Sequence, residues 1–351
     1  MSWQAKGTFS RYAVAARTGD VPVMISISVA TWDHDRSLPV LNGEVPVPGF
    51  SVDSHILPTS ELFPIAVKEA RFDVTELSLS SHILQVARGD NSYLAIPVFL
   101  ARAFRHNGFF RRAGSGINSL SDLAGRTVGV PEYQMTAALW MRGLLSDDYG
   151  VRADAIRWRT GALDKGIRHE RLALKPPPCL SITPIRDGET LQQLLFEGEV
   201  DALLAPHPPA AFRAGDPRIE RIVPDFEQAE QEYYRRTGFF PIMHVIAVRR
   251  TLCDQHPDLP AKLFTAFSAA RDMALRRLED VWLGSANRLS LPWLNASLER
   301  TRGTMGADYW PYGFAAARAE LAAACRYSVE QHLAPRLVAP DELFHPSVLD
   351  T

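Results

Sequence analysis

Cysteine is scarce in this chain of 351 residues, which contains only Cys179, Cys253 and Cys325. The three are odd in number, far apart in the sequence and without the spacing of metal ligands. This usage predicts neither a disulfide framework nor a zinc site, and it fits a reducing compartment best.

Long apolar runs are missing too, because the sequence has no stretch of about eighteen apolar residues that could span a membrane. Met1 to Tyr12 show neither the hydrophobic core nor the cleavage pattern of an export signal. The formal net charge is only -2, which gives no electrostatic reason to expect a nucleic-acid partner. We therefore expect a cytoplasmic protein that binds neither a membrane nor nucleic acid.

Several motifs of common enzymes are absent. The chain has no Gly-rich nucleotide loop and no Gly-x-Ser-x-Gly elbow, which argues against kinases, Rossmann oxidoreductases and α/β-hydrolases. Its ten histidines form no His-x-His or His-Glu-x-x-His motif, and His34 between Asp33 and Asp35 is readily explained by a charged loop. We predict no metal and no organic cofactor. The sequence leaves open that four histidines converge in space: His82, His106, His207 and His244.

The length exceeds what one hydrophobic core usually organises, so two lobes with a ligand cleft between them are expected. The apolar pattern predicts a first βαβαβ lobe, with elements at 21–30, 61–70, 72–77, 80–88 and 93–99. The helix at 80–88 is expected to be capped by serines.

The pattern restarts after Phe110 with strands predicted at 127–130, 155–159, 180–185 and 200–205 and helices at 134–145 and 190–196. Residues 161–179 are charged and rich in proline, which is typical of a surface excursion. A strand at 244–248 and a long helix from Leu259 then return to the first lobe. The α/β chain is therefore divided into lobe I (1–108), lobe II (109–240) and a return segment with C-terminal helices (241–351).

One junction has the geometry of an anion site. A short helical turn leads through Gly125 into the strand Thr127 to Val130, and Pro131 ends that strand just before the helix expected from Gln134. Helix N-termini carry partial positive charge and unpaired N–H groups, so bare backbone donors beside a cleft would suit a carboxylate.

Five segments in register resemble the 4,5-dihydroxyphthalate decarboxylase family: Val74–Ser81, Ile96–His106, Val128–Thr136, Phe240–His244 and Tyr309–Gly313. The resemblance covers nearly the whole chain and implies a type II periplasmic-binding-protein-like fold, with lobe I built from both ends of the sequence. It also implies a carboxy-lyase that converts 4,5-dihydroxyphthalate to protocatechuate. The alternative is a non-catalytic solute-binding protein or sensor for aromatic carboxylates.

Such a reaction makes clear chemical demands. Direct loss of CO2 would leave a ring carbanion without delocalisation, so the ring carbon that bears the carboxylate is expected to be protonated first. The site then needs a proton donor at that carbon, an acceptor near the para hydroxyl and cationic clamps for the carboxylates.

Three catalytic candidates follow from these demands. His244 is the first candidate for the general acid, although it could also be a strand histidine bonded to backbone. Glu76 could accept the phenolic proton, orient a histidine or cap the helix near Ser80, and His106 is a further candidate. Arg102 and Arg105 follow a buried strand and are favoured as carboxylate clamps, with structural ion pairs as the alternative.

The remaining substrate-binding candidates lie in loops and at helix starts. Asp35 and Arg36 could bind ring hydroxyls or the retained carboxylate, or form a surface ion pair. The others are Ser80, His82, Glu132, Tyr133, Gln134, Thr136 and His207. Glu132 could read a hydroxyl, be protonated by burial or simply supply favourable charge at a helix start. The resemblance would place an arginine at His207 and an aromatic hydroxyl at His82, which leaves the ring substitution open. A homo-oligomer is possible.

Overall fold

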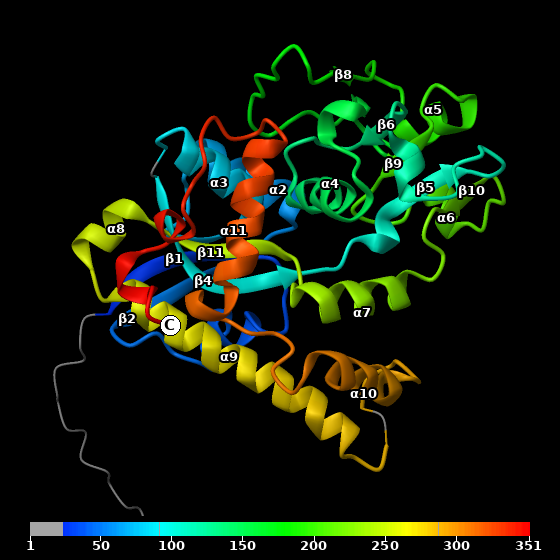
Figure 1. Ribbon diagram of the computed structural model, residues 1–351. Coiled ribbons are helices and arrows are strands. Elements are labelled where there is room, and N and C mark those ends of the chain that lie inside the picture. The colour runs from blue at the N-terminus through cyan, green and yellow to red at the C-terminus, as the bar shows by residue number, and fades with distance from the viewer. Residues whose placement is uncertain (1–23, 91, 287) are drawn as a thin grey trace, which may run out of the picture.

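The computed structural model describes residues 24–90, 92–286 and 288–351, and its strands form two separate sheets (Figure 1). The first sheet has the order β2-β1-β3-β11-β4, which places β3 at its centre. The β1 strand pairs in parallel with β2 and β3, whereas β11 runs antiparallel to β3 and β4. The bounds are β1 Ile25–Thr31, β2 Phe50–Ile56, β3 Val74–Ser78, β4 Tyr93–Arg102 and β11 Ile242–Arg249.

The second sheet has the order β10-β5-β9-β6-β7-β8. The strands β9, β6, β7 and the edge strand β8 are parallel, and β5 is antiparallel to both β9 and β10. The bounds are β5 Phe109–Arg112, β6 Thr127–Val130, β7 Arg157–Thr160, β8 Ile182–Pro184, β9 Ala202–Leu204 and β10 Ile219–Arg221. The chain passes from the first sheet to the second between β4 and β5 and returns ahead of β11. We propose that the two sheets mark the centres of lobes I and II.

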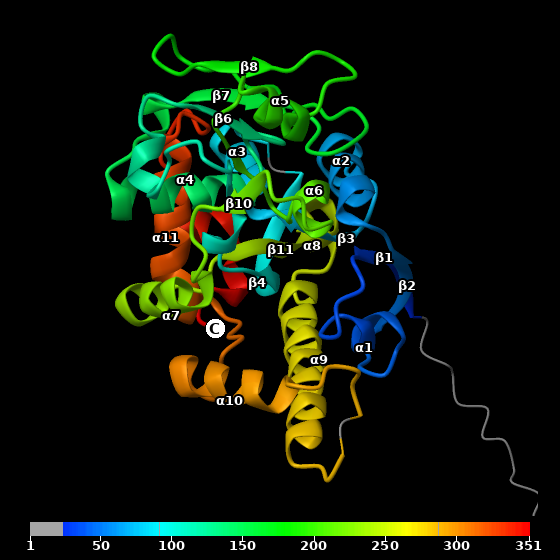
Figure 2. The same cartoon turned by 90° about the vertical axis from the view of Figure 1, so that its right-hand side faces the viewer.

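Helices cover both sheets and make up most of the C-terminal part. Their bounds are α1 Leu38–Leu41, α2 Thr59–Glu69, α3 Leu79–Ala87, α4 Thr136–Tyr149, α5 Leu191–Glu197, α6 Ala210–Arg213, α7 Phe226–Thr237, α8 Arg250–Gln255, α9 Leu259–Trp282, α10 Leu294–Met305 and α11 Phe314–Glu330. Figure 2 shows α9 and α10 projecting together at one end of the molecule, and α11 beside α4. Among the described residues, none of the helices combines the length and apolarity needed to cross a bilayer.

The α/β class and the helical C-terminal region agree with the sequence-based expectation. The strand predicted at 127–130 is β6 itself, and the helix predicted at 134–145 starts two residues later as α4. Residues 21–23 of the first predicted strand lie outside the described residues. The β2 strand was not predicted, because it is a half-exposed edge strand whose burial does not alternate.

The predicted serine cap of α3 is wrong. Ser78 is the N-cap residue, but its side chain makes no capping hydrogen bond. Its Oγ instead lies 2.8 Å from Thr136 Oγ1, at the start of α4. The Ser78 hydroxyl therefore links the start of α3, which follows β3 of the first sheet, to the start of α4, which follows β6 of the second sheet. It does not cap α3.

Close packing of α11 on α4 joins the return segment to the second sheet. A methyl group added at Gly143 of α4 would lie 2.4 Å from the buried Tyr327 ring of α11. That ring also packs edge-on against Trp140, with 5.6 Å between centroids, and its hydroxyl donates to Asp147 at 2.5 Å. Gly143 is thus required by the close approach of two helices.

Gly143→Ala is expected to lower the free energy of unfolding by about 1–3 kcal/mol, because the fixed Tyr327 ring cannot yield the space. Urea denaturation measures the change. The matched control is Gly303→Ala in α10, where an added methyl group meets nothing within 4 Å. Helix propensity should make that variant more stable by about 0.5–1 kcal/mol. Equal effects of the two substitutions would contradict the packing argument.

Candidate active site

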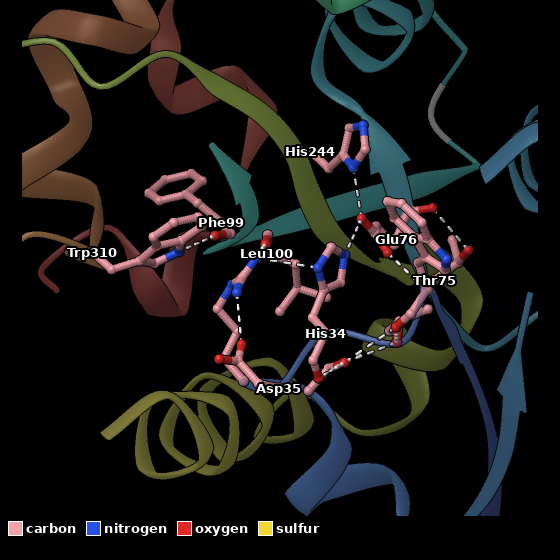
Figure 3. Close-up of polar contacts among 12 residues, drawn as sticks. His34, Asp35, Thr75, Glu76, Phe99, Leu100, His244 and Trp310 are labelled. Carbon is pink, nitrogen blue, oxygen red and sulfur yellow. Dashed lines mark hydrogen bonds and ion pairs between the residues drawn. The ribbon is translucent and has the colours of Figure 1, made fainter. Parts of the chain in front are cut away.

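A fully buried carboxylate lies on the central strand of the first sheet. Glu76 of β3 has no exposed surface, and three donors approach it. The backbone N–H of Trp32 donates to Oε2 at 2.9 Å, and Oε1 lies 2.9 Å from His34 Nε2 and 2.6 Å from His244 Nδ1 (Figure 3). We call these residues the His34–Glu76–His244 cluster.

Strand register accounts for this meeting. Ile246 of β11 is directly opposite Glu76 of β3, so His244, two residues earlier on β11, presents its side chain on the same face of the sheet. His34 lies in the loop after β1, the other neighbour of β3. The strands on the two sides of β3 therefore bring one histidine each to the same carboxylate, His244 on β11 and His34 in the loop after β1.

Arg36 sets the tautomer of His34. Its Nη2 lies 3.1 Å from His34 Nδ1, and because a guanidinium can only donate, Nδ1 accepts and Nε2 carries the proton that faces Glu76. Arg36 is itself held by a 2.7 Å bond from its Nε to the Leu100 carbonyl and by stacking on Trp310, 4.0 Å from the ring centroid.

The cluster has the spacing of a metal site, since its ligand atoms lie within 4.8 Å of one another. A metal on His34, however, would need the lone pair of Nε2 and a proton on Nδ1, where that proton would face the N–H of Arg36. The arrangement favours proton transfer over metal binding. We therefore keep the proposal of a site without metal.

Charge and burial oppose each other within the cluster. Burial raises the pKa of Glu76, but hydrogen bonds from His244 and His34 outweigh it and hold the pKa well below its usual range. Burial, with smaller effects of nearby His34 and Arg105, lowers the pKa of His244 and together they outweigh the raising effect of Glu76. His244 is thus neutral at neutral pH in the free protein, and Nε2, which points away from Glu76, carries a lone pair (Figure 3).

The start of α4 lies against the end of β3. Thr136 Oγ1 accepts the Ser80 N–H at 3.0 Å and contacts Ser78 Oγ, while the buried Ser80 Oγ has no hydrogen-bond partner among the described residues. These contacts bring Ser80 and Thr136 together across the two sheets.

The backbone N–H groups before α4, which were expected to have no hydrogen-bond partner, already donate hydrogen bonds within the chain. The N–H groups of Tyr133 and Gln134 donate to the two carboxylate oxygens of Glu170, the second at 3.2 Å. Glu170 comes from the segment between β7 and β8, residues 161–181, which we call the β7–β8 segment. The backbone donors at this junction are therefore used by a carboxyl group of the chain itself.

The side chains at the same junction are also engaged. Tyr133 is buried and its hydroxyl donates to the Gln331 carbonyl at 3.1 Å, while the Gln134 amide contacts Ser81 Oγ at 3.2 Å. Glu132 binds two arginines, with Arg168 Nε at 2.7 Å and Arg171 Nε at 2.9 Å. The carboxylate of Glu132 is thus paired rather than reading a hydroxyl.

Arg171 is a candidate that the sequence did not reveal, because residues 161–179 were expected to be a surface excursion. Its guanidinium carbon lies 5.2 Å from the Phe63 ring centroid, and the same ring packs edge-on against His244 at 4.8 Å. Its Nη1 is buried without a hydrogen-bond partner among the described residues. A guanidinium with an N–H to spare therefore lies near the cluster.

Arg105 is the second such cation. It lies close enough to His244 to lower the pKa of the imidazole, and its Nε is buried without a partner among the described residues. Its hydrogen bonds go to neutral groups, with Nη1 3.2 Å from the Pro206 carbonyl and Nη2 2.8 Å from Met243 Sδ, and the carboxyl group of Glu230 lies near enough to interact with it electrostatically. Burial lowers the pKa of Arg105 to about 10, which leaves it protonated at neutral pH.

Several predicted residues are engaged elsewhere. Arg102 forms a buried ion pair with Glu320 at 2.9 Å, and buried His82 contacts the Leu343 carbonyl at 2.8 Å. Burial lowers the pKa of His106 to about 4, and this residue lines a surface hollow with Asp147, Tyr233 and Arg236.

Two further candidates lie at the surface. His207 is exposed beside the Pro208 carbonyl, and exposed Asp35 pairs with Arg36 at 2.7 Å. The structure does not bring His82, His106 and His207 into the cluster; His34 takes that place.

Comparison with known proteins gives relatives over most of the chain. A 4,5-dihydroxyphthalate decarboxylase of Comamonas testosteroni is 39% identical over 330 residues, which cover 93% of this chain and 98% of the relative. A protein of the same name from Pseudomonas putida is 35% identical over 215 residues, covering 61% and 83%. No family model matches the chain.

Solved structures show the fold. The periplasmic aliphatic sulphonate binding protein of Escherichia coli superposes with a TM-score of 0.52 at 13% identity, covering 92% of each chain. At this identity the likeness concerns the fold alone, and it agrees with the expected type II periplasmic-binding-protein-like architecture.

Glu170→Gln is expected to remove a pH-dependent loss of stability. Burial and nearby Glu132 raise the pKa of Glu170 to about 7 from 4.5, against the lowering effect of two backbone N–H groups and Arg142. The folded state therefore retains the proton at pH values where the unfolded chain has released it, and stability falls as pH rises through this window. Between pH 5 and 8 the wild type should lose about 1–3 kcal/mol more unfolding free energy than the variant.

Denaturant titrations at the two pH values measure this difference. The control is Glu69→Gln, which removes a carboxylate from an exposed pair with Arg71 and should follow the wild type. Parallel pH profiles for wild type and Glu170→Gln would show that Glu170 does not hold its proton in the folded state.

Proposed function

The chain belongs to the 4,5-dihydroxyphthalate decarboxylase family, and we propose that it is a carboxy-lyase that converts 4,5-dihydroxyphthalate to protocatechuate and CO2. The identity and coverage of the two named relatives support the reaction. The structural observation that carries the proposal is the buried Glu76 carboxylate, which leaves Nε2 of His244 available for proton transfer. The paired Glu76 and His244 suit a reaction that must place a proton on a ring carbon.

The reaction balances without a redox partner. A new C–H bond forms at the ring carbon that bears the departing carboxylate, while the para hydroxyl gives up its proton and its oxygen supplies electron density to the ring. The C–C bond to the carboxylate then breaks, CO2 leaves, the bonding pair restores the aromatic ring, and the phenolate oxygen takes back from solvent the proton that it had released there. Overall, one proton replaces one CO2.

His244 is the proposed proton donor. Glu76 accepts from Nδ1, so the imidazolium that forms on protonation is stabilised on one side and presents an N–H from Nε2 on the other. A bound dianion beside His244 would raise the pKa that burial has lowered, and this would charge the imidazole when substrate is present. With three donors already on its oxygens, Glu76 is proposed to position His244 rather than to accept the phenolic proton.

Arg105 and Arg171 are the proposed carboxylate clamps. Each has a buried N–H group without a partner among the described residues, and each lies near His244 or the ring that packs on it. Two guanidiniums suit a substrate with two neighbouring carboxylates, since each charge-assisted bond contributes about 1.5–3 kcal/mol. Asp35, which is exposed, is the proposed partner of a ring hydroxyl.

We further propose a cytoplasmic location. Its support is the free state of Cys179, Cys253 and Cys325, which is typical of proteins in a reducing compartment.

The function is tested by incubating the purified protein with 4,5-dihydroxyphthalate and following CO2 together with product mass. The wild type should release CO2 and form protocatechuate. His244→Asn should lower kcat by about 10² or more, because the amide can replace Nδ1 on Glu76 but offers no proton donor at the position of Nε2. Substrate binding, measured by calorimetry, should remain.

The control is His55→Asn, which changes a partly exposed histidine paired with Asp53 on β2 and should leave turnover intact. Near-normal turnover of His244→Asn would remove this residue from the role of proton donor. A wild type that binds the diacid without releasing CO2 would favour the solute-binding alternative.

Arg171→Ala is expected to raise KM by about 10- to 100-fold, which corresponds to the loss of one charge-assisted clamp. Arg168→Ala is the matched control, because both arginines bind Glu132 but Arg168 is the more exposed. Its KM should stay within a few-fold of the wild type. Steady-state kinetics compares the two, and equal changes in KM would assign the effect to the shared pairing with Glu132.

A further inference from the structure

A second group of metal-ligand side chains shares no residue with the His34–Glu76–His244 cluster. Ligand atoms of Asp154, Cys179 and His332 lie within 4.8 Å of one another. The Cys179 Sγ is 3.9 Å from His332 Nε2. The decarboxylation proposed above uses none of the three.

These residues come from three distant parts of the chain. Asp154 lies in the short 3-10 turn Ala153–Ala155 after α4, and Cys179 lies near the end of the β7–β8 segment. His332 follows Gln331, the C-cap residue of α11. The loop after α11 thus meets the segment that precedes β8 (Figure 1). Such a group has no spacing signature, which explains why the scattered cysteines predicted no zinc site.

The donor set selects the kind of ion. A thiolate sulfur, an imidazole nitrogen and a carboxylate oxygen are the ligands of zinc, whereas magnesium and calcium prefer oxygen alone. At ordinary Zn–S and Zn–N distances, two tetrahedral ligands lie about 3.6 Å apart. The observed 3.9 Å between Cys179 Sγ and His332 Nε2 is close to this value and too long for a strong hydrogen bond.

The surroundings favour a bound ion with an open position. Cys179 is exposed and the other two ligands are partly buried, so solvent can supply the fourth ligand. Arg152 holds Asp154 through bonds of 3.1 and 2.9 Å, which fixes the carboxylate and places positive charge near the thiol. Both effects are typical of the outer shell of a metal site with a thiolate ligand.

The backbone at His332 adds an independent observation. His332 has a φ of +58°, and among the described residues only Ala70 shares a positive φ without being glycine. This conformation costs a residue with a β-carbon about 1–2 kcal/mol, although histidine tolerates it better than most. Glycine would be less strained at this helix end, so the imidazole is retained at a cost in stability.

We propose that Asp154, Cys179 and His332 bind a divalent ion of the zinc class. The ion fastens the β7–β8 segment to the end of α11. That segment also holds Arg168, Glu170 and Arg171 against the residues before α4. Metal binding at Cys179, near the C-terminal end of the segment, therefore stabilises its folded position. The role is structural and goes beyond the decarboxylation.

The test uses the full-length, chelator-treated protein titrated with Co2+, whose bond to a thiolate gives a charge-transfer absorption band. The wild type should show this band at one equivalent. Cys179→Ser should lose it, and His332→Ala should weaken Co2+ binding by about 100-fold or more. His55→Ala, which changes a partly exposed histidine with an aspartate neighbour, should bind as the wild type does.

Thermal unfolding gives a second readout. Saturating Zn2+ should raise the Tm of the wild type but not that of Cys179→Ser. The absence of a thiolate–cobalt band, or equal binding in wild type and Cys179→Ser, would overturn the proposal. Because the His34–Glu76–His244 cluster contains no sulfur, its occupation by cobalt cannot produce the band. CO2 release by the chelator-treated wild type tests the decarboxylase separately.

Discussion

The site depends on keeping one ionised carboxylate inside the first sheet. An unpaired buried carboxylate would cost several kcal/mol, and Glu76 offsets that cost with three donors from β11 and the loop after β1. The same bonds decide where His34 and His244 lie and which nitrogen of each faces inward. Through Arg36, the arrangement also extends to the Leu100 carbonyl and to Trp310 in the C-terminal part. Stability of the sheet and orientation of His244, the proposed proton donor, therefore rest on one set of hydrogen bonds.

Charge compensation continues on the side of the second sheet. There the chain supplies its own acceptors, because the carboxyl group of Glu170 binds the backbone at Tyr133 and Gln134 while Glu132 binds Arg168 and Arg171. A dicarboxylate that enters this region would meet N–H groups already in use, together with one N–H group each of Arg105 and Arg171 that has no partner within residues 24–90, 92–286 and 288–351. Selectivity would then come from the few donors that remain unsatisfied rather than from the total positive charge.

The architecture itself does not distinguish an enzyme from a carrier, since a sulphonate-binding protein shares it at 13% identity. What differs is the chemistry placed on it. A binding site needs only donors for the ligand, whereas the paired Glu76 and His244 also provide an imidazole whose second nitrogen is free of the carboxylate. The packing of α11 over Gly143 joins the return segment to the second sheet.

The sequence by itself determined the α/β class, the strand Thr127–Val130 and the helix that follows it, while its family resemblance supported the choice of His244 as a candidate. The class, the strand and the helix follow from local periodicity and strand ends, which are readable within about ten residues. Only the tertiary structure decided that His34 shares Glu76 with His244, that Glu170 fills the helix start and that Arg171 reaches Phe63. It also brought Cys179 to His332. These contacts depend on which strands become neighbours and in which register, and no local pattern encodes that choice.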